Sequence, residues 1–404
     1  MFKMPSISWD APIFVHVGFT NTGTTSLQRN FFSTRDDIFF AGEPYGERGG
    51  IFTAIKSIED FKFDTALVED QCAELIYRRS GGRPIVISDE NLCDTPQLYF
   101  GPYVVPRDTI ARRLHHFFPS AKIIFTIRDQ RQYAVSAYFN LKKNTAFCDA
   151  MPVPSFSTWL SAMLSRKRSH FLQNLNLLEI IDYYATLFGH ENVCVLPLEM
   201  LVIDGAEIYL RTLCDFLGIP FSDPDAANYT EIHNRRMSRR RKFAAELLQD
   251  ARFSCLFAEL TDLLGSERLD AFLDEGPRAS VELQPEDEEK IRCRVGAGNW
   301  LLAHEFGLEL ARYGYLMAGD DNFSRRQLDA ARQELAYRSD VERLRQHAGG
   351  KELVAAREAA EIARLHRLAM ELSTVRQSPV WRVVERLDRI RRLMLCTNRV
   401  APRS

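Results

Sequence analysis

The chain has 404 residues, of which 46% are hydrophobic and 26% charged, a composition that excludes a disordered chain and predicts a large buried core. Lysine and arginine number 52 against 54 aspartate and glutamate. The net charge of −2 provides no chain-wide field for nucleic acid, so no nucleic-acid partner is expected. The length indicates one large α/β domain with additions, or two domains.

The first half alternates short apolar runs with amphipathic stretches, which is the pattern of parallel strands joined by helices. Five strands are predicted at residues 12–18, 38–41, 84–88, 122–128 and 192–197. Helices are predicted to begin near Thr24, Phe63, Arg107, Gln130, Leu175 and Ala206. From about Arg239 to Leu310 every pattern is helical, so a helical lobe packed against the sheet domain is expected.

Beyond residue 319 the composition shifts towards Ala, Arg, Glu and Leu, which predicts a domain boundary. We therefore expect a domain at 1–319, with an α/β core at 11–218 and a helical lobe at 219–319. Between residues 355 and 372, apolar and small side chains recur at three- and four-residue steps, as in a coiled coil. A coiled-coil segment at 320–375 would make a homo-oligomer, and a single helix docked on the domain is the alternative.

The last segment, 376–404, carries eight arginines against Glu385 and Asp388, with apolar side chains at helical spacing. Such a cationic amphipathic helix can lie on an anionic membrane surface, and docking on its own domain or on a partner is the alternative. Eight scattered cysteines without a C-x-x-C pair predict neither a zinc site nor disulfides. No secretory signal or membrane span is recognised, so a cytoplasmic protein is expected, peripheral to the inner face of the membrane if the tail binds there.

The segment 18–28, G-F-T-N-T-G-T-T-S-L-Q, leaves the first predicted strand and enters a helix. Two glycines let the backbone turn sharply, and N–H groups at the start of the helix can aim at an anion. Thr22, Thr24 and Thr25 add hydroxyl donors that suit phosphate or sulfate oxygens. The segment therefore predicts a phosphate-binding loop, with an ordinary strand-to-helix turn as the structural alternative.

The glycine spacing matches the nucleotide-binding pattern G-x-x-x-x-G, but Thr24 stands where that pattern has lysine. This replacement counts against an ATPase or GTPase. A nucleotide kinase or NTPase that binds ATP with magnesium is kept as the least favoured hypothesis.

A second candidate anion site lies about a hundred residues further on. The apolar strand 122–128 ends in Arg128, and Ser136 follows two turns into the next helix. An arginine at the carboxyl end of a parallel strand points into the crevice where such sheets bind ligands. Its guanidinium can fork onto phosphate oxygens, and the serine can reach the same group. A surface ion pair is the alternative role for Arg128.

Residues 18–28 resemble the 5′-phosphosulfate loop, G-x-P-K-T-G-T-T-x-L-Q, of bacterial carbohydrate-type sulfotransferases that use 3′-phosphoadenosine-5′-phosphosulfate (PAPS). The Arg128-x7-Ser136 spacing resembles the 3′-phosphate site of the same family. S-D-E-N-L at 88–92 is similar to its S-S-E-N-L, and the likeness extends over residues 11–317. Near the C-terminus, S-P-V-W-R at 378–382 is similar to an S-x-x-W-R ending of bacterial glycan-modifying enzymes.

The resemblance implies a P-loop NTPase-like sulfotransferase fold with a central parallel sheet, a helical lobe and a C-terminal helical extension. It implies PAPS as the co-substrate, no metal, and transfer of a sulfuryl group to a hydroxyl of a carbohydrate or glycolipid acceptor. The residues implied in donor binding are Thr20, Asn21, Thr22, Gly23, Thr24, Thr25, Arg128 and Ser136.

Three positions in the two anion-binding motifs depart from the family pattern. Asn21 replaces the loop lysine, and its amide can donate a hydrogen bond but carries no charge for the leaving phosphate. Loss of one such donor typically costs about 10²–10³ in rate. Thr20 replaces the loop proline, and Gln130 stands where the second motif often has proline. The alternative function is therefore a catalytically weak or silent PAPS-binding or scaffold protein, and Asn21 is itself a candidate catalytic residue.

The preferred general base is Glu90, because it lies just beyond a strand's carboxyl end and matches the family's S-S-E. Glu43, after the strand 38–41, is the second candidate on the same positional argument. His16 is internal to a strand and is expected to be a core histidine. The basic run 234–242 would close over the donor's phosphates, steer an anionic acceptor, or begin a solvated helix.

Overall fold

The computed structural model describes residues 11–42, 51–58, 62–73, 80–93, 105–145, 155–165, 170–229, 238–247, 251–277 and 279–318, with isolated positions at 329–330, 333 and 336. The chain divides into two compact units, Met1–Leu335 and Ala336–Ser404. The predicted tail at 376–404 lies outside the described residues, as does the predicted coiled-coil segment except for the isolated positions.

The centre of the first unit is a five-stranded parallel sheet in the order β2-β3-β1-β4-β5. Its strands are β1 (Ile13–His16), β2 (Phe39–Phe40), β3 (Ile85–Ser88), β4 (Lys122–Ile127) and β5 (Val193–Pro197). Each lies inside the range predicted for it, because a short apolar run bounded by turn residues is a strong local signal. The predicted α/β class is confirmed.

The helices that precede β4 are α1 (Thr24–Asn30), η1 (Phe32–Thr34), α2 (Ile51–Ser57), α3 (Thr65–Cys72), η4 (Glu90–Leu92) and α6 (Arg107–Phe117). Those between β4 and residue 229 are α7 (Gln130–Thr145), α8 (Phe156–Ser165), α9 (His170–Leu175), α10 (Leu177–Phe188), η5 (His190–Asn192), α11 (Leu198–Ile203), α12 (Ala206–Leu217) and α13 (Asp223–Asn228). The remaining helices are α14 (Arg239–Leu247), α15 (Ala251–Leu264), α16 (Ser266–Asp274) and α17 (Pro285–Phe306). Within the described residues, no helix is both long enough and apolar enough to cross a membrane.

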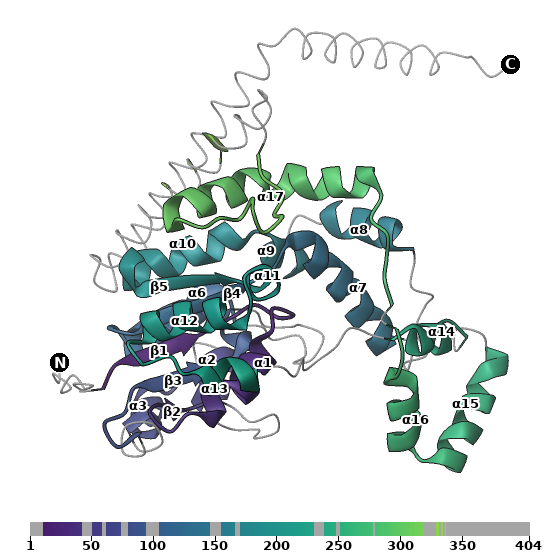
Figure 1. Ribbon diagram of the computed structural model, residues 1–404, viewed down its shortest axis with the longest axis horizontal. Helices are drawn as coiled ribbons and strands as arrows, with labels where there is room; N and C mark the ends of the chain where they lie inside the picture. The colour runs from purple at the N-terminus through teal and green to yellow at the C-terminus, as the bar shows by residue number, and fades with distance from the viewer. Residues whose placement is uncertain are drawn as a thin grey trace, which may run out of the picture. The chain divides into compact units, whose positions relative to one another are not determined.

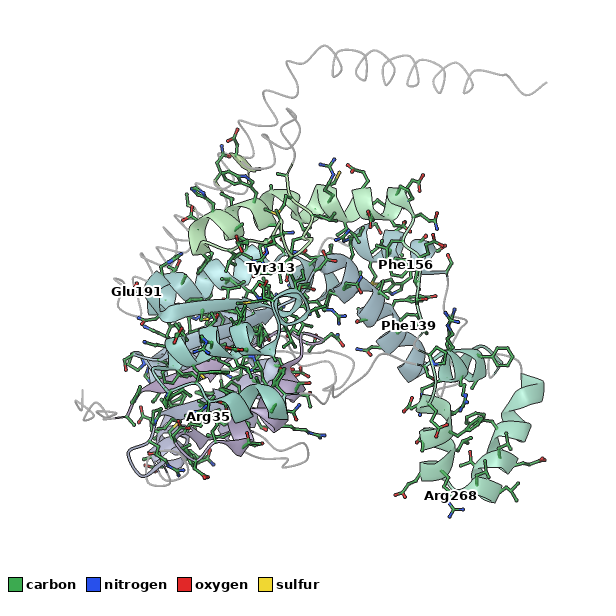
Figure 2. All side chains as sticks on the ribbon, viewed as in Figure 1. Arg35, Phe139, Phe156, Glu191, Arg268 and Tyr313 are labelled. Carbon is green, nitrogen blue, oxygen red and sulfur yellow. The ribbon has the colours of Figure 1, made fainter. Side chains whose placement is uncertain are left out.

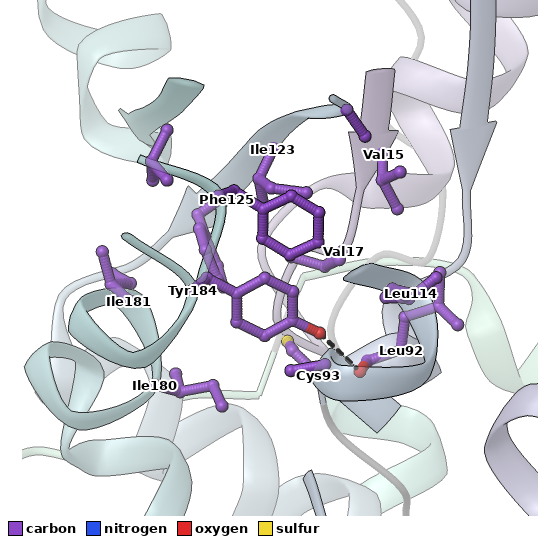
Figure 3. Close-up of a cluster of buried hydrophobic side chains, with 14 of the residues drawn as sticks. Val15, Val17, Leu92, Cys93, Leu114, Ile123, Phe125, Ile180, Ile181 and Tyr184 are labelled. Carbon is purple, nitrogen blue, oxygen red and sulfur yellow. Dashed lines mark hydrogen bonds between the residues drawn. The ribbon is translucent and has the colours of Figure 1, made fainter. Parts of the chain in front are cut away.

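Successive side chains of each strand point to opposite faces of the sheet, and helices cover both faces (Figure 1). Val15, Ile87 and Phe125 face a large cluster shared with α6, α10 and α17. Figure 3 shows part of it, where the hydroxyl of Tyr184 donates to the carbonyl oxygen of Leu92 over 3.2 Å. Phe14 and its neighbours on the opposite face pack against α1 and α12. Because both faces are covered, the carboxyl ends of the strands are the edge from which polar loops emerge.

The described part of residues 239–310 is mostly helical, as predicted, but its helices pack in two separate places. Helix α17 lies along α10, and its Leu301 and Leu302 belong to the main core. Helices α14, α15 and α16 pack on one another and meet the rest of the unit where α14 contacts α7 (Figure 1). A third apolar cluster, which includes Phe139 of α7 and Phe156 of α8, joins α7 to α8, α9 and α17 (Figure 2).

A buried amide pair explains one departure from the family pattern. Gln130, the first residue of α7, has a side chain that is only 1% exposed. Its Nε2 donates to Oδ1 of Asn299 in α17 over 2.6 Å, and Nδ2 of Asn299 donates back to its Oε1 over 3.1 Å. Asn299 also donates to the carbonyl oxygen of Leu316 over 2.8 Å. Glutamine at this position therefore ties the helix of the second motif to α17, which proline could not do.

Candidate anion-binding site

The loop between β1 and α1 turns tightly because three of its residues take left-handed backbone conformations. The φ angles are 44° at Gly18, 65° at Asn21 and 83° at Gly23. A Cβ at Gly18 would lie 2.5 Å from Cγ2 of Thr24, and one at Gly23 would lie 2.9 Å from Cδ1 of Leu198, so both positions require glycine. Left-handed residues at alternate positions 21 and 23 are typical of backbone nests that bind anions.

The predicted hydroxyl donors of the loop are engaged within the protein. The Thr22 side chain is 1% exposed, and its hydroxyl donates to the carbonyl oxygen of Phe19 over 2.5 Å. It is therefore turned beneath the loop, which differs from the expectation that it serves a ligand. The Thr24 hydroxyl donates to Oε2 of Glu90 over 2.5 Å. For these two residues, the group left to contact a bound anion is the backbone N–H.

The structure brings the two predicted motifs together. Arg128 follows directly after β4, and its Nη1 donates to the carbonyl oxygen of Asn21 over 3.0 Å. The same nitrogen donates to Oγ of Ser136 in α7 over 3.1 Å. Because parallel strands end at one edge of the sheet, the loop after β1 and the arginine after β4 become neighbours. The guanidinium places a positive charge beside the loop.

Asn140 is a site residue that the sequence interpretation missed. Its Nδ2 donates to the side-chain Oδ1 of Asn21 over 2.9 Å. Asn140 lies one turn after Ser136 on α7, so one helix face contacts both Arg128 and Asn21. The four-residue spacing was a signal available in the sequence. Since Asn140 binds the oxygen of the Asn21 amide, the nitrogen of that amide is the atom available to donate to a ligand.

Glu90 is the first residue of η4, two residues after β3 ends, and its hydrogen bond from Thr24 brings it to the start of α1. Its predecessor Asp89 forms a buried ion pair with Lys56 of α2 and receives the N–H of Asn91 over 2.9 Å. This anchoring holds the segment after β3 against the loop. Glu43, the second candidate for the base, lies outside the described residues.

The tyrosine segment at 313–315 also reaches the edge of the sheet where the strands end. Glu199 of α11 accepts the N–H of Asp129 at Oε1 over 3.0 Å and the hydroxyl of Tyr315 at Oε2 over 2.8 Å. Burial raises the pKa of this carboxyl group, while the two hydrogen bonds oppose the shift. The backbone around Arg128 is therefore held through Glu199 by the tyrosine segment at 313–315.

His16 is confirmed as a core histidine. Its ring is 1% exposed, with Nδ1 2.7 Å from Oγ of Ser88 and Nε2 3.2 Å from Oγ1 of Thr126. Burial lowers the pKa of this imidazole to about 3, so the ring is neutral.

The described part of the basic run does not point to the loop. Arg241 pairs with Asp270 and Asp274 of α16, and Arg240 pairs with Glu275. These pairs join α14 to α16 and differ from the expectation that the described arginines close over the donor's phosphates. The alternative, that the run begins a solvated helix, holds for Arg239 and Arg240, which are exposed at the start of α14. Residues 234–237 lie outside the described part of the chain. Among the described residues, no three His, Cys, Asp or Glu side chains gather as metal ligands.

A family model described as "Sulfotransferase family" matches residues 12–223. This range contains the loop, Glu90, Arg128 and Ser136. No curated protein matches the chain.

Three solved structures are similar to the chain at low identity. A sulfotransferase from Alicyclobacillus acidocaldarius is 17% identical, with a TM-score of 0.44, and the match covers 75% of this chain and 98% of that one. The mouse sulfotransferase SULT7A1, solved with PAP, is 14% identical, with a TM-score of 0.36 and coverage of 80% and 89%. A sulfotransferase domain from the curacin biosynthetic pathway is 15% identical, with a TM-score of 0.33 and coverage of 69% and 95%.

Proposed function

This chain belongs to the sulfotransferase family, and from that premise we propose that it transfers a sulfuryl group from PAPS to a hydroxyl group of an acceptor. The observation that carries the proposal is the position of Arg128, which donates to both Asn21 and Ser136. The loop at 18–28 and the pair formed by Arg128 and Ser136 thus lie side by side. A nucleotide with phosphate groups at both its 5′ and 3′ positions needs two such sites.

The chain's own residues fit that donor. The loop would hold the phosphosulfate group, because Gly18 and Gly23 keep the backbone free of side chains where a Cβ would collide. Arg128 and Ser136 would hold the 3′-phosphate, for which a planar guanidinium beside a hydroxyl is well suited. The donor residues we propose are those predicted from the sequence, with backbone contacts in place of the side-chain hydroxyls of Thr22 and Thr24.

When bound, PAPS supplies the sulfuryl group and the leaving phosphate. Glu90 would accept the proton of the acceptor hydroxyl, and the hydrogen bond from Thr24 orients its carboxylate beside the loop. Asn21 would donate from Nδ2 to the leaving phosphate, since Asn140 holds its Oδ1.

We propose a carbohydrate or glycolipid as the acceptor, because the S-P-V-W-R segment at 378–382 resembles an ending of glycan-modifying enzymes. Peripheral membrane contact through residues 376–404, oligomerisation through 320–375 and a cytoplasmic location complete this proposal. The membrane contact is supported by the arginine-rich, amphipathic pattern of the last segment, and the oligomerisation by the coiled-coil spacing of the preceding one.

The test is calorimetric binding of 3′-phosphoadenosine-5′-phosphate (PAP), the desulfated donor, beside ATP with magnesium. We expect the parent to bind PAP and not ATP, and the Arg128→Ala variant to lose PAP binding. Preference for ATP would favour a nucleotide kinase or NTPase. Absence of both would reject the donor assignment.

A second candidate function is a catalytically weak or silent PAPS-binding protein. It is supported by Asn21, whose uncharged side chain is held by Asn140 in the place of the loop lysine. Both candidates predict PAP binding, so turnover of PAPS separates them.

A further inference from the structure

Three neighbouring strands place a polar side chain on the same face of the sheet, beneath the phosphate loop. His16 of β1 stands opposite Ser88 of β3 in the parallel register. It also stands opposite Ile124 of β4, and Thr126, two residues further along, points to the same face. The three polar side chains are each at most 1% exposed. Such buried polar groups are stable only when their hydrogen bonds are satisfied.

These side chains form a series of hydrogen bonds that ends at the carbonyl oxygen of Phe19, and this end fixes the donor and the acceptor in each bond. A carbonyl oxygen can only accept, so Thr22 donates its single hydroxyl proton to the carbonyl of Phe19 over 2.5 Å. Across the 2.8 Å contact between the two threonines, Thr126 must then be the donor to Thr22. Thr126 therefore accepts from Nε2 of His16 at 3.2 Å, and the imidazole proton lies on Nε2.

The same reasoning extends to the other nitrogen of the ring. Nδ1 of neutral His16 is an acceptor, so Ser88 donates its hydroxyl proton to it over 2.7 Å. Oγ of Ser88 accepts in turn from Nε2 of Gln28 in α1 at 3.1 Å. The low pKa of His16, about 3, agrees with this arrangement, because a protonated ring would present a donor where an acceptor is needed. The complete relay runs Gln28, Ser88, His16, Thr126, Thr22, Phe19.

We propose that His16 is a positioning residue of the phosphate loop, acting as the neutral Nε2–H link of this relay. The relay ends on Phe19 and Thr22, the residues that bracket Thr20 and Asn21, and begins on α1 at the far side of the loop. It therefore fixes the shape of the loop before a ligand arrives. The ring lies close under the loop, since a Cβ at Gly18 would be 3.4 Å from Nε2. The significance of the loop for catalysis rests on the proposed function.

The first test reads the tautomer of His16 in the unmodified full-length protein. Histidine-selective ¹⁵N labelling and long-range ¹⁵N–¹H spectra distinguish the two neutral tautomers and the charged ring. The His16 signals are identified by their loss in the His16→Gln variant. We expect the Nε2–H tautomer, unchanged between pH 5 and pH 8. A proton on Nδ1, or titration in that range while the protein stays folded, would overturn the inference.

The second test breaks the relay at Thr126. Thr126→Val removes the hydroxyl with little change in shape, and Thr126→Ser retains it. The readout is hydrogen exchange of the loop amides at 19–23 in the absence of ligand. Because one hydrogen bond contributes up to about 1.5 kcal/mol, we expect exchange to be up to about tenfold faster in the valine variant. The serine variant should behave as the parent. Parent-like exchange in a folded Thr126→Val protein would contradict the positioning role.

PAP binding separates this inference from the proposed function. We expect PAP affinity to fall by up to about tenfold in Thr126→Val and to be retained in Thr126→Ser. Arg128→Ala should lose PAP binding and keep the Nε2–H tautomer of His16. A parent that fails to bind PAP would reject the donor assignment. The tautomer of His16 and the hydrogen exchange of the loop amides would still test whether His16 positions the loop.

Discussion

Arg128 and Asn21 are 107 residues apart in the chain, yet Nη1 of Arg128 donates a 3.0 Å hydrogen bond to the carbonyl oxygen of Asn21. The arginine thus holds the backbone of the loop that is proposed to bind the donor nucleotide. Its second contact, with Ser136, connects the same guanidinium to α7. Changes at Arg128 are therefore expected to affect the shape of the loop as well as its charge.

The Arg128→Lys variant tests whether geometry matters beyond charge. Lysine is a point charge without the planar fork of a guanidinium, so it cannot reproduce both contacts and bind phosphate in the same way. A hydrogen bond to a charged group contributes about 1.5–3 kcal/mol, so we expect PAP affinity to fall about 10- to 100-fold by calorimetry. Ser136→Ala, which removes one neutral partner, should have a smaller effect. Equal affinity in Arg128→Lys and the parent would show that charge alone is required.

The Asn21→Lys variant tests the missing loop lysine. We expect turnover of PAPS to rise by about 10²–10³, because a cationic donor would then lie near the leaving phosphate. The left-handed backbone at Asn21 disfavours lysine by about 1–2 kcal/mol, so a small loss of stability should accompany the gain. Asn21→Gly, which suits that backbone without a side chain, is the matched control. The measurement is release of PAP from PAPS with a panel of sugar acceptors.

Activity in Asn21→Lys from an inactive parent would identify the parent as a binding protein. An active parent that loses turnover in Asn21→Gly would instead show that the asparagine serves catalysis.

Glu90→Gln removes the proposed base and keeps the size of the side chain, whose oxygen can still accept from Thr24. We expect kcat to fall about 10²–10⁴-fold with PAP affinity nearly unchanged, because a general base acts only on the acceptor's proton. The measurement is steady-state turnover beside calorimetry. A Glu90→Gln enzyme with the parent's kcat would exclude this residue as the base and direct attention to Glu43.

His16 should make stability depend on pH. Its folded pKa of about 3 lies below the ordinary value of 6.5, so between these values the unfolded chain binds the extra proton. The contribution of His16 to stability is therefore complete above pH 6.5 and is lost as the pH falls. From pH 7 to pH 5 the loss amounts to about 2 kcal/mol. Urea unfolding of the parent and of His16→Gln at both pH values isolates this contribution, since other titrating groups cancel. An identical pH response in both proteins would contradict the prediction.

Gln130→Pro restores the residue that the family pattern often has at this place. Proline is tolerated at the first position of a helix, but Asn299 would then lose its buried amide partner. We expect a loss of about 1–3 kcal/mol in unfolding free energy. PAP affinity should change little. The double variant Gln130→Pro with Asn299→Leu should recover part of the loss. A fully stable single variant would indicate that the amide pair does not stabilise the α7–α17 contact.

The strands, the phosphate loop and the start of α7 were predictable because their signals are local. A short apolar run between turn residues defines a strand, and G-x-x-x-x-G after it defines a tight turn. The burial of the Thr22 hydroxyl was not predictable in this way. Its partner Thr126 is 104 residues away, and only the order β3-β1-β4 brings the two strands together. The pairing of Arg241 with α16 likewise depends on how two helices pack.

The sequence by itself determined the α/β class, the position of the loop and the identity of Arg128 and Ser136 as candidates, since each depends on residue type and short-range spacing. Only the tertiary structure decided that Arg128 touches Asn21, that Asn140 holds the side chain of Asn21, and that His16 links three strands. Hydrogen bonds act over about 3 Å, and which distant residues come within that distance is set by strand order and register.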